Sequence, residues 1–165
     1  MGLMARPGRD GMEDLVVDPP NGFSPPKPLV VEVKSSRKPN ISRDDLRQLD
    51  DWVFELSGEE DARKHGIGVP GAIITQGLGA VGRHPTPHKG VMVFNGPLTV
   101  PFDLRTGSLG ANEEEFARKR SFAIIPSATL LACAKAIDAR RDRRSEIWSA
   151  IHVCEGLFSL HTSDG

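Results

Sequence analysis

The stretch Leu29-Val30-Val31-Glu32-Val33-Lys34 is apolar except at two positions, and its β-branched residues predict a strand. Side chains alternate along a strand, so Glu32 and Lys34 project from one face and Val33 from the other. A carboxylate binds hard divalent cations through oxygen, and a lysine beside it can orient an attacking water or neutralise a phosphate. Glu-x-Lys also arises by chance about once per couple of hundred residues, so a solvated strand end is the alternative interpretation.

A second carboxylate is expected from the preceding strand. Leu15-Val16-Val17 and the stretch from Leu29 flank a turn-rich loop, a pattern that predicts a hairpin. If Asp18 lies opposite Leu29, the pairing puts Asp14 opposite Val33. A one-residue slip puts Asp14 across from Glu32, with Cα atoms about 5 Å apart. Asp18 would then lie on the order of 13 Å from the site, so Asp14 is the expected ligand.

A helix is predicted after this strand. Ser42 is a favourable N-cap, and Asp44 and Asp45 suit the positive first turn. An apolar stripe follows at three- and four-residue spacing, formed by Leu46, Leu49, Val53 and Leu56. Gly58 is the expected terminator.

Gln48 and Trp52 are four residues apart and share one flank of this helix. Gln48 is a candidate to hydrogen-bond a metal-bound water or a phosphate oxygen. Trp52 is a candidate to stack on a base or sugar, with a place in the core as the more common role of such a tryptophan.

The rest of the chain alternates strands and helices, which indicates an α/β fold with a mixed sheet. Residues 1–12 have no periodicity and are expected to be an irregular tail, with one domain over 13–165 and a loop-rich insertion at about 57–88. Further elements are expected as strands at 72–75, 91–94 and 122–125 and as helices at 112–119, 127–139 and 145–153.

Asp14, Glu32-Val33-Lys34 and the helix bearing Gln48 and Trp52 together resemble the PD-(D/E)xK nuclease superfamily. The pattern is similar to the branch with a Gln-x-x-x-Tyr helix motif, with Trp52 in the Tyr place. This resemblance implies a restriction-endonuclease-like mixed sheet flanked by helices. It further implies an endo- or exonuclease whose expected substrate is DNA. It also implies Mg²⁺, or Mn²⁺ in its place, held by Asp14, Glu32 and the carbonyl of Val33, with Lys34 assisting the attacking water and Gln48 in the catalytic group.

The superfamily core usually opens with a helix and a strand ahead of the Asp-bearing strand, and residues 1–12 are expected to lack both. A homodimer or a partner chain supplying this layer is one consequence. A chain whose start was assigned too late is a second, and a catalytically inactive domain that serves as a nucleic-acid or protein interaction module is the third.

Composition limits the remaining classes. The 21 basic and 22 acidic side chains give a net charge of -1, so DNA contact needs a local patch, such as the arginines and lysines at 118–120 and 140–144. A solvated helix end is an equally good interpretation of that patch. Cys133 and Cys154 are expected to be reduced core thiols, and no apolar run suits a signal peptide or membrane span, so a cytoplasmic protein is expected.

One motif suggests a rival activity. Residues 77–82 form a literal G-x-G-x-x-G, but Pro85 and Pro87 would break the helix that a dinucleotide site requires, so a loop is expected. His84 and His88 lie in the same Pro-rich stretch, which offers no third ligand for a metal.

Overall fold

The computed structural model describes residues 4–7, 14–19, 21–25, 27–35, 41–64, 88–96, 101 and 109–160. The strands within these ranges are β1 (Met4–Pro7), β2 (Leu15–Asp18), β3 (Leu29–Ser35), β4 (Lys89–Asn95), β5 (Ala123–Pro126) and β6 (Gly156–Leu157). The helices are α1 (Arg43–Lys64), α2 (Ala111–Lys119), α3 (Ser127–Ala139) and α4 (Arg143–Val153). None of these helices has the length and apolar character needed to cross a membrane.

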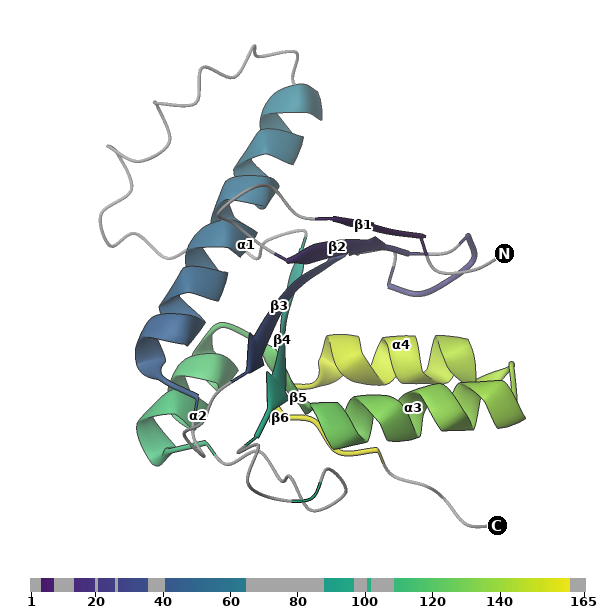
Figure 1. Cartoon of the computed structure of the whole chain (residues 1–165). Helices are drawn as coiled ribbons and strands as arrows, with labels where there is room; N and C mark the ends of the chain where they lie inside the picture. Colours follow the sequence, from purple (N-terminus) through teal and green to yellow (C-terminus); the bar gives the residue numbers. More distant parts are fainter. Residues whose placement is uncertain are drawn as a thin grey trace.

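The six described strands form one mixed sheet in the order β1-β2-β3-β4-β5-β6 (Figure 1). β1, β2 and β3 pair antiparallel, whereas β3 to β6 run parallel. The prediction of an α/β chain with a mixed sheet flanked by helices is therefore confirmed.

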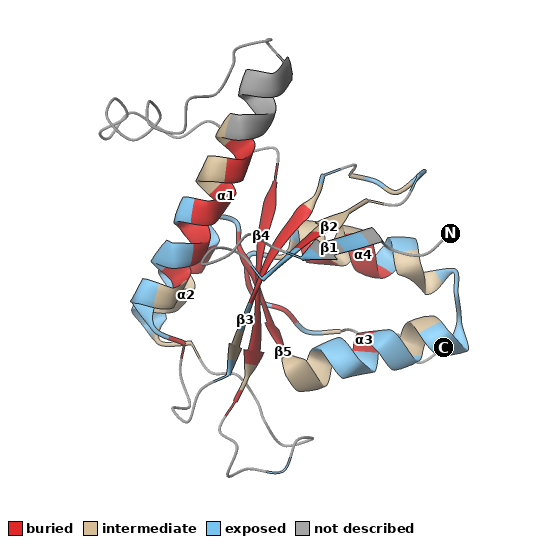
Figure 2. Cartoon of the chain, turned by 45° about the horizontal axis from the view of Figure 1, so that its top comes forward, coloured by how far each residue is buried: buried red, intermediate tan, exposed pale blue. Residues whose placement is uncertain are grey.

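The two faces of the sheet are covered by different helices because apolar side chains alternate along the strands. Val30, Met92 and Ile124 pack with Leu46 and Leu49 of α1 in one core cluster. The intervening positions of the same strands, such as Val31 and Val91, form a second cluster with Cys133 of α3 and Trp148 and Ile151 of α4. Figure 2 shows the buried central strands between the two helical layers.

Helix α1 begins as predicted. The N–H of Asp45 donates to Ser42 Oγ over 3.2 Å, and the N–H of Ser42 donates to Asp45 Oδ2 over 3.0 Å, which is a capping box. The predicted end at Gly58 is wrong, because the helix continues to Lys64. A glycine inside a helix costs only about 1 kcal/mol relative to alanine, and good helix formers follow it.

The longer helix moves the start of the predicted insertion from residue 57 to beyond residue 64. Residues 65–87 lie outside the described part of the chain. The strand expected at 72–75, the glycine motif at 77–82 and His84 all fall within this range.

The prediction of an irregular tail over residues 1–12 is wrong in part, because it contains β1. This strand pairs antiparallel with β2, with Met4 opposite Asp18 and Pro7 opposite Leu15. Four residues are too few for an alternation signal, and Pro7 is acceptable only because β1 is an edge strand. The expected lack of a strand ahead of Asp14 is therefore wrong as well.

Smaller differences lie at the ends of the C-terminal elements. Ser127 does not cap α3 but is its first residue, and its hydroxyl donates to Asn95 Oδ1 over 3.1 Å. Helix α4 begins at Arg143 instead of Ser145, and the two-residue strand β6 has no sequence signal. Cys133 and Cys154 are free thiols, as predicted.

Candidate active site

The candidate site lies near the end of β3, on the face that α1 covers. Glu32 and Lys34 project from the same face, as strand alternation requires. Lys34 Nζ lies 2.6 Å from Glu32 Oε1, and the Glu32 side chain is buried while that of Lys34 is partly buried. The predicted carboxylate–ammonium pair is therefore formed.

Hairpin pairing brings Asp14 to this pair. Leu15 lies opposite Val31 and Val16 opposite Val30, a register that places Asp14 across from Glu32. Asp14 Oδ2 accepts a hydrogen bond from the N–H of Val33 over 2.6 Å. The slipped register is thus the one that forms, while Asp18 lies at the far end of β2.

Glu32 is only 4% exposed, and its Oε2 atom has no hydrogen-bond partner among the described residues. Burial raises the pKa of the Glu32 carboxyl; Lys34 opposes this rise, and the nearby charge of Asp14 adds to it. An orphaned carboxylate oxygen beside a second carboxylate is electrostatically costly. A cation between the two carboxylates would give the Oε2 atom of Glu32 a partner and would reduce the repulsion between Glu32 and Asp14.

Lys34 is held by α1 as well as by Glu32. Its ammonium donates to Gln48 Oε1 over 3.1 Å and lies 3.9 Å from Asp45 Oδ1. Gln48 therefore positions Lys34, a role that differs from the predicted contact with a water or phosphate. Asp45 is a contact that sequence reasoning missed, although its three-residue spacing from Gln48 puts both on one side of the helix.

The oxygen donors at this site fit a hard cation. Both polar groups of a strand residue face the same edge, so the carbonyl of Val33 lies on the edge where its N–H meets Asp14. The described ranges contain no group of three His, Cys, Asp or Glu side chains that could hold a metal ion. The oxygen donors near one another here are the carboxylates of Asp14 and Glu32 and the carbonyl of Val33. Mg²⁺ suits such a set because it keeps several waters and uses substrate phosphate oxygens.

Trp52 does not lie in the site. It is 7% exposed and belongs to the core cluster with Leu49, Val53 and Leu56. A base cannot stack on a buried indole, so the predicted nucleic-acid contact is replaced by a packing role.

The predicted basic patch is largely neutralised by ion pairs within helix α2 and in the connection between α3 and α4. Arg118 lies 2.6 Å from Glu114, and Lys119 lies 2.6 Å from Glu115. Arg140 pairs with Asp142 at 2.7 Å. Solvated helix ends describe these residues better than a nucleic-acid surface does.

The raised pKa of Glu32 predicts how stability changes with pH in metal-free protein. The protonated carboxyl contributes stability that is fully present below 4.5, the ordinary pKa of a glutamate, and is lost as pH rises through the higher folded pKa. The Glu32→Gln variant has no such loss, so it should become more stable than the wild type as pH rises through this window. Urea unfolding in EDTA across a pH series measures the difference, and a difference independent of pH would contradict the burial argument.

No family model, curated protein or solved structure matches this chain. Function is therefore inferred from the geometry of Asp14, Glu32 and Lys34.

Proposed function

We propose that this chain is a Mg²⁺-dependent nuclease of the PD-(D/E)xK type, with a restriction-endonuclease-like fold, that hydrolyses phosphodiester bonds in DNA. The observation that carries the proposal is the orphaned Oε2 atom of Glu32, buried beside Asp14 and next to Lys34. The strand β1 ahead of Asp14 supports it further, because it supplies one of the two elements that the family pattern requires there.

Each side chain has a defined task in this proposal. Asp14 and Glu32 hold the metal together with the carbonyl of Val33, and Mn²⁺ can replace Mg²⁺ on the same oxygen ligands. A bound Mg²⁺ stabilises charge on the phosphate and lowers the pKa of a coordinated water. Lys34 orients the attacking water and balances negative charge, and Gln48 fixes the position of its ammonium.

Solvent exposure is consistent with a reaction at this position. Asp14 is exposed whereas Glu32 is buried, so the site spans the boundary between the core and water. A phosphate can approach from the Asp14 side, while the buried side of Glu32 keeps its carboxylate in a medium of low dielectric constant, where charge interactions are strong.

Cleavage of plasmid and circular single-stranded DNA by the purified chain tests the proposal. We expect nicking or linear products in Mg²⁺ or Mn²⁺ and none in EDTA. RNA in parallel reactions defines the substrate class. If the chain binds nucleic acid but cleaves none in either metal, the nuclease proposal is wrong and the interaction-module hypothesis is favoured.

A further inference from the structure

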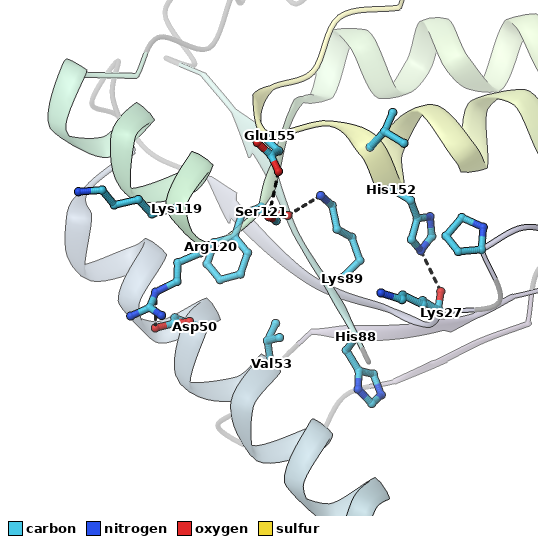
Figure 3. A pocket seen from close by; sticks show the side chains of 13 residues that line it. Lys27, Asp50, Val53, His88, Lys89, Lys119, Arg120, Ser121, His152 and Glu155 are labelled. Carbon is cyan, nitrogen blue, oxygen red and sulfur yellow. Dashed lines mark hydrogen bonds and ion pairs between the residues drawn. The ribbon is translucent and has the colours of Figure 1, made fainter. Parts of the chain in front are cut away.

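A cavity of about 550 Å³ lies beside the first residue of β4 (Figure 3). Lys89, the first residue of β4, lies in its wall and is opposite Leu29, whereas Glu32 is opposite Met92. Three residues of strand, roughly 10 Å, separate the two positions. The charged side chains that line the cavity are Lys27, Asp50, Lys89, Lys119, Arg120 and Glu155.

The basic side chains that line this cavity outnumber its carboxylates, which are those of Asp50 and Glu155. Arg120 lies 3.3 Å from Asp50, and Lys119 pairs with Glu115 outside the cavity at 2.6 Å. Within the described part of the chain, Lys27 and Lys89 have no carboxylate at ion-pair distance. Figure 3 shows the side chain of Lys27 extending from the wall into the cavity.

Lys89 is almost fully buried at 6% exposed. Its ammonium donates to the carbonyl oxygens of Ser121 and, over 2.6 Å, Cys154. An ammonium carries three N–H donors, so one remains after these two bonds. Burial lowers the pKa of Lys89; the nearby charges of Cys154 and Glu155 oppose this, and that of Lys27 adds to it.

His152 also lines this cavity, and both nitrogens of its ring face carbonyl oxygens. Its Nδ1 atom lies 2.9 Å from the carbonyl oxygen of Trp148 and its Nε2 atom 3.0 Å from that of Lys27. A neutral imidazole donates only one hydrogen bond, so the ring donates to both carbonyls only when it is protonated. Burial lowers the pKa of His152; the two carbonyls oppose this, and the charges of Lys89 and Lys27 lower it further.

We propose that this cavity binds a terminal phosphate monoester, with Lys27 and the third N–H of Lys89 as its principal donors. A terminal phosphate carries a charge of about -1.5 to -2 at pH 7 and presents three oxygens. Because only one side of it is esterified, these oxygens can enter the cavity as far as the buried ammonium of Lys89. A phosphodiester within a strand carries one charge and is flanked by sugars on both sides. The source is either a free nucleotide or the phosphorylated end of a nucleic-acid strand.

Calorimetric titration of the full chain with dAMP and with inorganic phosphate, in EDTA, tests this site. We expect saturable binding that weakens at least about tenfold in Lys27→Ala, because a charge-assisted hydrogen bond is lost. Lys135→Ala, an exposed lysine of α3 outside the cavity, should bind like the wild type. Absence of saturable binding, or equal weakening by the two variants, would overturn the proposal.

An NMR titration of the His152 ring locates the bound phosphate. The pKa of His152 should rise when phosphate is present, because the anion offsets the charges of Lys27 and Lys89. Saturable phosphate binding that leaves this pKa unchanged would place the ligand elsewhere and overturn the proposal.

Short oligonucleotides with a 5′-phosphate or a 5′-hydroxyl distinguish the two sources. Tighter binding of the 5′-phosphorylated strand than of dAMP identifies a strand end, whereas tighter binding of dAMP identifies a free nucleotide. Equal binding of the phosphorylated and hydroxyl strands would contradict the requirement for a terminal phosphate. Because EDTA removes the metal, these outcomes are independent of whether the chain cleaves DNA.

Discussion

Replacing Glu32 with glutamine is expected to lower the rate of Mg²⁺-dependent DNA cleavage by at least about 10³-fold, because the proposed metal site loses its buried carboxylate. Glutamine keeps the size of the side chain but removes the charge on the orphaned Oε2 atom. Single-turnover cleavage of plasmid DNA measures the rate. In the absence of metal, the same variant should be more stable than the wild type at neutral pH.

Asp14, directly before β2, and Asp18, its last residue, provide the matched control for this experiment. Asp14→Asn should lose activity on the scale of Glu32→Gln, whereas Asp18→Asn, four residues further along, should cleave at the wild-type rate. Lys34→Met should lose about 10²- to 10⁴-fold, the range for a group that assists proton transfer. A Glu32→Gln variant that cleaves within a few-fold of the wild type would show that this carboxylate does not hold the catalytic metal.

Replacing Trp52 with alanine is expected to lower the free energy of unfolding by about 3–5 kcal/mol, because it removes a large side chain from a packed core. Trp52 is buried in the cluster that joins α1 to the sheet. Urea unfolding followed by circular dichroism measures the loss.

Trp52→Phe is the companion variant, since it keeps an aromatic ring in the core. It should cost much less stability and leave nucleic-acid affinity unchanged. If Trp52→Phe weakens nucleic-acid binding while the folded state stays stable, the indole contacts the nucleic acid in addition to packing in the core.

Gln48 and Lys34 show how far sequence reasoning can go within the site. Their presence in one region follows from a strand followed by a capped helix, but the hydrogen bond between them depends on how α1 crosses β3. Sequence spacing predicts which residues share a face of one element. It does not predict which residues of two elements meet, because that depends on the packing of side chains between them.

The same limit explains the errors at β1 and Gly58. A four-residue strand gains its stability from pairing with β2, which no local pattern records. The cost of Gly58 within α1 is small enough for the neighbouring helix formers to outweigh it. The cavity with Lys27 and Lys89 went unpredicted because its walls come from segments far apart in the sequence.

By itself, the sequence determined the strand that carries Glu32 and Lys34, their common face and the start of the helix after them, because alternation and capping are local properties of the backbone. Only the tertiary structure decided between the two registers of the hairpin, and so between Asp14 opposite Glu32 and Asp14 opposite Val33. A shift of one residue moves every side chain of a strand to the other face, and burial of Val16 in the core cluster that contains Leu46 and Leu49 of α1 selects one register. That selection is what places a second carboxylate beside the buried Glu32.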